Sequence, residues 1–167
     1  MKRFIYILSF LIALPILSSC DNEDDLVGIF IGKTWILTDI MQGTTSYFVW
    51  NTESTEEEKA ESKELLGTGE NYWIAFAGSV ADGTISGTYT GKAVSTVGFS
   101  NVNWSATQKK KFYSDLYKFE INESEPLAKE FIYGLENADS YQGDYNNLSI
   151  YYTREGKKYS LLLRVRN

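Results

Sequence analysis

The fold is decided by residues 124–165, which read SEPLAKEFIYGLENADSYQGDYNNLSIYYTREGKKYSLLLRV. This stretch opens with Ser124-Glu125-Pro126, and proline is favoured in the first turn of a helix. Leu127, Phe131 and Leu135 then recur at the spacing that places side chains on one helical face. The pattern predicts an amphipathic helix that begins at the proline and buries this face.

The second part of the same stretch predicts a β-hairpin. Residues 148–152 and 159–165 are rich in leucine, isoleucine and tyrosine, and the turn-forming residues 154–157 lie between them. In the last strand, Leu161 and Leu163 share one face and polar side chains take alternate positions. We therefore expect this strand to have one buried face.

More strands are predicted upstream of the helix. They are rich in β-branched and aromatic residues and comprise residues 34–40, 47–50, 72–76, 84–90, 92–97 and 99–104. Residues 107–116 indicate a short helix or a loop, because Phe112 and Leu116 are spaced i, i+4. One main helix among many strands predicts an α+β fold, in which a mostly antiparallel sheet or partly closed barrel packs on that helix in a single domain.

A polar insert interrupts the strands at residues 52–68. It is rich in glutamate, and both Ser54-x-x-Glu57 and Thr55-x-x-Glu58 have the pattern of a helical capping box. Gly67 is a typical residue for ending a helix. The insert is predicted to be a solvated helix held by Leu65 and Leu66, with a disordered loop as the alternative.

The first twenty residues resemble a bacterial lipoprotein signal. Lys2 and Arg3 precede the apolar residues 4–17, and Leu17-Ser18-Ser19-Cys20 matches a lipobox. The resemblance implies that residues 1–19 are removed and that Cys20 carries lipid such as palmitate. This lipid would attach the domain to a membrane. The apolar run is short for a membrane span.

Residues 20–31 are predicted to form a lipidated tether. Its acidic residues 21–25 are similar to the tag behind the lipidated cysteine of surface-exposed Bacteroidota lipoproteins, which implies outer-membrane attachment, with the domain facing either outward or the periplasm. The apolar residues 26–31 are expected to dock beneath the domain as one helical turn. Residues 32–167 would then be the folded domain.

Charge and composition exclude several classes of function. The formal net charge is −6, and loss of two positive charges with residues 1–19 leaves −8, which argues against a nucleic-acid partner. The chain has no histidine, which excludes Ser-His-Asp and Cys-His sites. Its one cysteine is Cys20, so no thiol remains after lipidation. We therefore expect no enzyme activity and no cofactor.

The second half of the chain resembles the META/heat-shock-lipoprotein family of envelope domains. The residues that carry the resemblance are Phe131, Leu135, Tyr141, Leu148, Gly156 and residues 161–165, with Trp35 and Leu37 in the first half. It covers about residues 32–166 and implies a β-rich domain around one helix, without known catalytic residues. Gly32-Lys33-Thr34-Trp35 resembles the start of a lipocalin barrel less closely, which would imply a ligand cavity.

Two sets of oxygen-rich side chains are candidates for a catalytic or metal site. A paired-carboxylate site could in principle be drawn from Glu70, Asp82, Glu120, Glu123, Asp139 and Asp144. Residues 136–144 carry side chains that suit calcium but lack the spacing of an EF-hand loop. We interpret the carboxylates as a solvated surface, and residues 136–144 as a polar loop without metal.

Exposed aromatic side chains are the remaining candidate for a binding site. The predicted patch consists of Trp104, Tyr141, Tyr151 and Tyr152. The resulting hypothesis is a monomeric, membrane-anchored envelope lipoprotein that binds a protein or a glycan without catalysis. The alternatives are a lipocalin-like carrier of a small apolar ligand and an inhibitor of a basic secreted enzyme.

Overall fold

The computed structural model describes residues 23–94 and 98–166 and has the predicted α+β fold. The strands are β1 (Thr34–Gln42), β2 (Thr45–Ser46), β3 (Trp73–Ala81), β4 (Thr84–Lys92), β5 (Phe99–Thr107), β6 (Phe112–Ser114), β7 (Ala138–Gly143), β8 (Asn147–Arg154) and β9 (Lys157–Val165). The helices are α2 (Glu23–Phe30), α3 (Tyr47–Trp50), α4 (Glu56–Gly67), the 3-10 helix η1 (Leu116–Lys118) and α5 (Pro126–Glu136).

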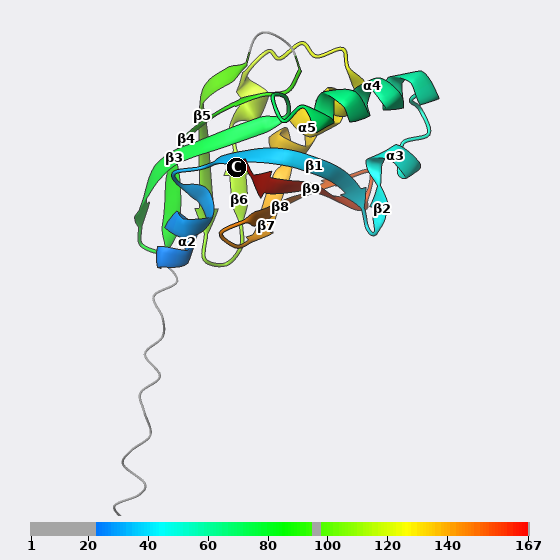
Figure 1. The fold of residues 1–167 in the computed structure, drawn as a ribbon. Helices are drawn as coiled ribbons and strands as arrows, with labels where there is room; N and C mark the ends of the chain where they lie inside the picture. The colour runs from blue at the N-terminus through cyan, green and yellow to red at the C-terminus, as the bar shows by residue number, and fades with distance from the viewer. Residues whose placement is uncertain (1–22, 95–97, 167) are drawn as a thin grey trace, which may run out of the picture.

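All described strands belong to one antiparallel sheet that curls on itself (Figure 1). Its order is β6-β5-β4-β3-β1-β9-β8-β7, and β2 pairs with β1 alone. The two edge strands meet at a single bridge between Lys111 and Ser140, where Tyr141 N donates to Lys110 O at 3.0 Å. The sheet therefore approaches a barrel without closing through a continuous ladder.

The predicted helix is α5, which packs against β8 and β9 and touches α4 and η1. Leu127, Phe131 and Leu135 are fully buried, as the helical periodicity requires. Glu125 is the N-cap residue, and its carboxylate accepts from Leu127 N at 3.2 Å and Ala128 N at 2.6 Å. This end of α5 is therefore fixed by a buried acidic side chain.

Helix α2 inserts an aromatic residue into the core, so the folded domain begins before residue 32, which the sequence predicts as its start. The Phe30 ring is fully buried and lies 4.8 Å from the ring of Trp104 and 4.9 Å from that of Tyr141, centroid to centroid. Leu26 and Ile29 are buried beside it. The predicted docking turn thus exists, but the residues from 23 to 30 are part of the fold rather than a tether that ends at residue 31.

Turns and caps confirm several local predictions. The β8–β9 hairpin turns at Glu155 (φ 51°) and Gly156 (φ 75°), and two successive positive φ values are typical of a tight hairpin turn. Thr55 and Glu58 form the predicted capping box, so the polar insert is a helix. The expected anchors Leu65 and Leu66 are half-buried against the core, and Lys59 and Ser62 are buried.

Three local predictions are wrong. Residues 47–50 form the short helix α3 instead of a strand. Residues 84–90 and 92–97 do not form two strands, because β4 continues through Gly91 to Lys92, and residues 95–97 lie outside the described part of the chain. Residues 107–116 contain the strand β6, since the i, i+4 pair Phe112 and Leu116 is buried equally well from a strand followed by a 3-10 turn.

Candidate functional site

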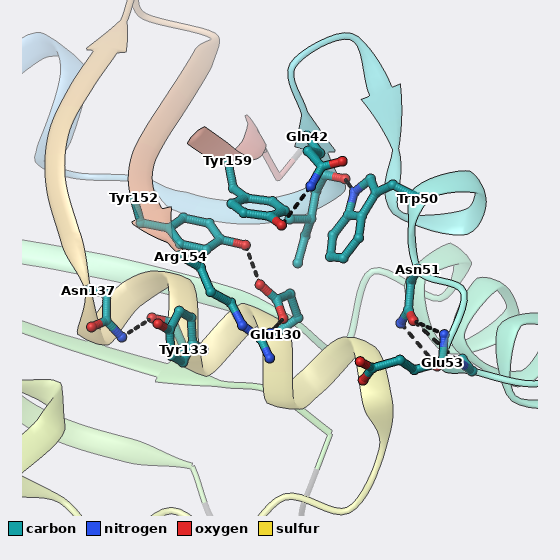
Figure 2. A network of polar contacts seen from close by, with 12 residues as sticks. Gln42, Trp50, Asn51, Glu53, Glu130, Tyr133, Asn137, Tyr152, Arg154 and Tyr159 are labelled. Atoms are coloured by element: carbon teal, nitrogen blue, oxygen red, sulfur yellow. Dashed lines mark hydrogen bonds and ion pairs between the residues drawn. The ribbon is translucent and has the colours of Figure 1, made fainter. Parts of the chain in front are cut away.

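The candidate site is built around Glu130, an acidic residue on the buried face of α5. Its position is i+3 from Leu127, so the helix carries the carboxylate toward the sheet, and the residue is only 7% exposed. Tyr152 donates its hydroxyl hydrogen to Glu130 Oε1 at 2.6 Å, and Arg154 Nη1 donates to Glu130 Oε2 at 2.7 Å. Each carboxylate oxygen thus has its own donor, as Figure 2 shows.

Strand β8 supplies both of these donors because inward side chains alternate along a strand. Ile150 and Tyr152 are buried, and Arg154 is the next residue on that side, at the end of the strand. The Arg154 side chain is 40% exposed, and its guanidinium lies 5.1 Å from the centre of the Tyr133 ring. Arg154 therefore joins the buried carboxylate to the surface.

The opposite wall comes from the end of β1, from α3 and from β9. Gln42 Nε2 donates to the hydroxyl oxygen of Tyr159 at 2.7 Å, and Trp50 Nε1 donates to Ile40 O at 3.0 Å. The rings of Trp50 and Tyr159 are 5.1 Å apart at an interplanar angle of 64°, and Tyr159 stacks on Tyr152 at 5.3 Å and 17°. Aromatic faces and polar groups thus meet side by side (Figure 2).

An open cavity of ≈ 220 Å³ lies between these walls. We call it the Glu130 pocket; its lining residues are Gln42, Trp50, Asn51, Thr52, Glu53, Glu130, Arg154, Glu155, Lys157 and Tyr159. Three of these side chains are acidic and two are basic, so opposite charges almost cancel. Asn51 Oδ1 accepts from Glu53 N and Ser54 N, which holds the rim between α3 and α4 in place.

The electrostatics fix the protonation of the two residues that contact Glu130. Burial, and then the negative charge of Glu130, raises the pKa of Tyr152 far above that of an ordinary tyrosine. The same charge raises the pKa of Arg154. Tyr152 therefore stays a hydrogen-bond donor and Arg154 stays a cation, which suits binding of a polar ligand better than proton transfer.

A second buried carboxylate, Glu125, lies at the start of α5 and has a structural role. Besides its two backbone donors, it accepts hydrogen bonds from the hydroxyls of Tyr72, at 2.9 Å, and Ser62. Both oxygens are thus occupied by donors within the protein. Glu125 joins α4, α5 and the residue just before β3, and it does not line the Glu130 pocket, which remains the better candidate.

The predicted aromatic patch is not formed on the surface. Trp104 and Tyr141 are 2% and 1% exposed and pack on Phe30, because their strands turn these side chains inward. Tyr152 is buried too, but it contributes to the site through its hydroxyl group. Tyr151 points to the other face of β8, where it is half-buried and lines a separate cavity of ≈ 310 Å³ with Tyr152.

The acidic candidates do not come together. Five of them are exposed, and Glu123 is half-buried and accepts from Val94 N. Residues 136–144 include strand β7 rather than a loop, and Asp144 accepts from Asn146 N and Asn147 N in the turn that follows. In residues 23–94 and 98–166, no group of three or more potential metal-ligating side chains occurs.

Sequence reasoning missed Glu130, although a signal exists. Leu127, Glu130, Phe131 and Gly134 fall on one helical face, and an acidic residue among apolar ones on that face needs partners when it is buried. Those partners come from a strand more than twenty residues later. Cys20 lies outside the described residues, and none of the described helices is long and apolar enough to cross a membrane.

Comparisons with known proteins agree with the fold. A family model described as a domain of unknown function, DUF4847, matches residues 21–165. A similar solved structure is the crystal structure of a DUF4847 family protein from Bacteroides vulgatus ATCC 8482, with a TM-score of 0.55 and 24% sequence identity, covering 83% of this chain and 96% of that chain. No curated protein matches. The resemblance to the META family stays a prediction.

Proposed function

Because this chain belongs to the DUF4847 family of domains of unknown function, we propose its function from its own structure: a non-catalytic binding module of the cell envelope. Lipid on Cys20 holds the domain at the outer membrane, and the ligand binds in the Glu130 pocket. Only Asp21 and Asn22 separate Cys20 from α2. About two acyl chains are needed for stable anchoring, and a lipobox cysteine is suited to carry them.

The observation that supports the module is the pair of Glu130 and Arg154 at an open cavity. Taking opposite charges out of water is unfavourable, and a buried ion pair is often no more stabilising than apolar side chains of similar volume. Stability alone therefore gives little reason to place Glu130 on the apolar face of α5. A role in holding Arg154 toward a ligand accounts for it.

The carrier alternative has less support because the inside of the curled sheet is filled. Helix α5 packs against β8 and β9. The rings of Phe30, Phe76, Trp104 and Phe112 lie within about 6 Å of one another toward the other end of the sheet. A lipocalin-like barrel would keep this space for its ligand.

The inhibitor alternative rests on α4. Glu56, Glu57, Glu58, Glu61 and Glu64 are exposed along this helix. Such a surface would attract a basic enzyme over a distance of about 8–10 Å at physiological salt. It is a second candidate because the acidic face adjoins the rim of the Glu130 pocket through residues 51–54.

The anchor and the binding site are tested separately. Mass spectrometry of the full chain purified from membranes should show an acylated Cys20 at the new N-terminus, and Cys20→Ala should release an unmodified protein. A Cys20 thiol without lipid in the membrane-purified chain would overturn the anchor.

Binding is tested by capture of envelope components on the immobilised Cys20→Ala protein. Gln42→Ala removes one polar side chain from the pocket wall, and Gln142→Ala is the matched control, since Gln142 is exposed on β7. We expect a component that the protein and the Gln142→Ala control retain and that Gln42→Ala loses. Equal retention by all three proteins, or no retention at all, would reject binding at this pocket.

A further inference from the structure

The size and charge of the Glu130 pocket restrict its ligand to a small, uncharged molecule. Drug-sized ligands occupy cavities of about 300–1,000 Å³, so ≈ 220 Å³ fits roughly one six-membered ring with its substituents. Arg154 is already paired with Glu130, and Lys157 is balanced by Glu53 and Glu155 on the same lining. The excess of carboxylates on the lining would repel an anionic ligand. The positive guanidinium of Arg154 would repel a cationic ligand.

The unused hydrogen-bonding groups of the pocket suit hydroxyl groups. Arg154 uses Nη1 for Glu130, and its other N–H groups donate to no described residue. Gln42 donates through Nε2 to Tyr159, which leaves the Gln42 amide oxygen as an acceptor and the Tyr159 hydroxyl hydrogen as a donor. A hydroxyl both donates and accepts, so neighbouring hydroxyls on one ring can satisfy this alternating set.

The aromatic part of the pocket suits the C–H face of the same ring. Trp50 and Tyr159 meet at 64°, which forms an apolar corner, and Tyr159 is fixed from behind by its stacking on Tyr152. A pyranose ring has hydroxyls at its edge and C–H groups on its faces. It would place a face on Trp50 or Tyr159 while its edge reaches Gln42 and Arg154.

On this basis we propose that the Glu130 pocket binds one ring of a neutral sugar, with Trp50 and Tyr159 as the stacking surface and Gln42 and Arg154 as the hydroxyl-binding groups. The assignment rests on the proposed binding module and names its ligand class. A peptide is the less favoured ligand, because the strands that line the pocket, β1, β8 and β9, are each paired on both sides and offer no edge that a peptide strand could extend.

The test is an NMR titration of the Cys20→Ala protein that follows its four tryptophan indole N–H signals. The probes are cellotriose, maltotriose, mannotriose and galactotriose, with trigalacturonate as the acidic probe and trilysine as the basic peptide. Trp50→Phe assigns the signal of interest. Trp35 and Trp104 are buried elsewhere and serve as internal controls.

We expect at least one neutral trisaccharide to shift the Trp50 signal saturably while the Trp104 signal stays in place. Gln42→Ala should weaken this binding about tenfold, as the loss of one or two good hydrogen bonds would. Gln142→Ala should leave it unchanged. Arg154→Lys keeps the charge near Glu130 but lacks the guanidinium fork, so it should weaken binding by a similar factor.

Other outcomes separate this inference from the proposed function. Tighter binding of trigalacturonate than of every neutral trisaccharide, or a Trp50 shift with trilysine alone, would overturn the neutral sugar and leave a binding module. No shift with any probe would also overturn the sugar; the module would stand only if capture of an envelope component still depended on Gln42. Loss of both results would reject both proposals.

Discussion

Tyr152 donates its hydroxyl hydrogen to Glu130 Oε1 at 2.6 Å, which links strand β8 to the buried face of α5. Replacing Tyr152 with phenylalanine leaves that carboxylate oxygen without this donor. Because a hydrogen bond to a charged group is involved, we expect Tyr152→Phe to lower the free energy of unfolding by about 2 kcal/mol. The measurement is urea denaturation followed by tryptophan fluorescence.

The matched control for this change is Tyr151→Phe. The Tyr151 hydroxyl donates to Gln142 Oε1 at 3.3 Å on the solvent side of β8, so its loss should change the free energy of unfolding by less than about 0.5 kcal/mol. Similar decreases in the free energy of unfolding for the two variants would show that the hydrogen bond to Glu130 contributes no more to stability than an exposed one.

Glu125 is expected to matter for stability although it is acidic and buried. Glu125→Ala removes the cap of α5 and leaves the hydroxyls of Tyr72 and Ser62 without their acceptor. Loss of a cap and of buried hydrogen bonds should together lower the free energy of unfolding by about 2–4 kcal/mol. Thermal denaturation followed by circular dichroism measures it. Glu120→Ala, at an exposed position, should leave the midpoint nearly unchanged.

Gly134 and Gly67 give a paired test of helix packing. A Cβ at Gly134 would lie 2.8 Å from Leu161 Cδ2 and 2.9 Å from Tyr152 Cε1, so Gly134→Ala should destabilise the fold by about 1–3 kcal/mol. At Gly67, the last residue of α4, a Cβ meets nothing within 4 Å. Gly67→Ala should therefore be neutral or stabilising by up to about 1 kcal/mol in the same urea titration. A Gly134→Ala variant as stable as the natural chain would contradict the packing of α5 against the sheet.

Glu136 should make stability depend on pH. Burial raises its pKa above the ordinary value of 4.5, and the residue also lies at the C-terminal end of α5, where a negative charge is unfavourable. The native state therefore binds this proton more tightly than the unfolded state, and its stability falls as the pH rises through the interval between the two pKa values.

The variant Glu136→Gln removes this dependence. It should be more stable than the natural chain at pH 7, and the difference in the free energy of unfolding should disappear in acid. Urea titrations at pH 4 and pH 7 measure both values, with Glu120→Gln as the exposed control. An advantage of Glu136→Gln that is equal at the two pH values would contradict burial as the cause.

Helix α2 should be essential to the fold. The Phe30 ring is fully buried against four other aromatic rings, so Phe30→Ala should lower the free energy of unfolding by about 3–5 kcal/mol. Val27 on the same helix is 43% exposed, and Val27→Ala should change the free energy of unfolding by less than about 1 kcal/mol. Both values come from chemical denaturation. A small loss in Phe30→Ala would mean that α2 is a tether after all.

Local patterns in the sequence were sufficient for α5, for the last hairpin and for the cap of α4. In each case neighbouring residues determine the structure, as with Pro126 at the start of a helix or Glu155 and Gly156 in a tight turn. They were not sufficient for α3, because four aromatic and β-branched residues favour a strand by propensity. In the fold, Tyr47 and Trp50 instead pack edge-on, 5.2 Å apart, over the end of β1.

The site was harder to predict than the fold because it depends on contacts between distant segments. The sequence predicts Tyr152 as an exposed aromatic residue, whereas in the structure it is buried and its hydroxyl contributes to the site. Glu130 resembles a surface residue of a helix until β8 and β9 are placed against α5. The register that brings Tyr159 opposite both Gln42 and Tyr152 is a property of the whole sheet.

The bridge between Lys111 and Ser140 also bears on how the molecule behaves at high protein concentration. Exposed strand edges invite intermolecular strand addition, the first step toward swapped dimers and fibrils. Here β6 is only three residues long, and its outer side is met by β7 of the same chain, with Tyr141 N donating to Lys110 O. A neighbouring molecule could extend the sheet at this place only by breaking contacts that the chain already makes with itself.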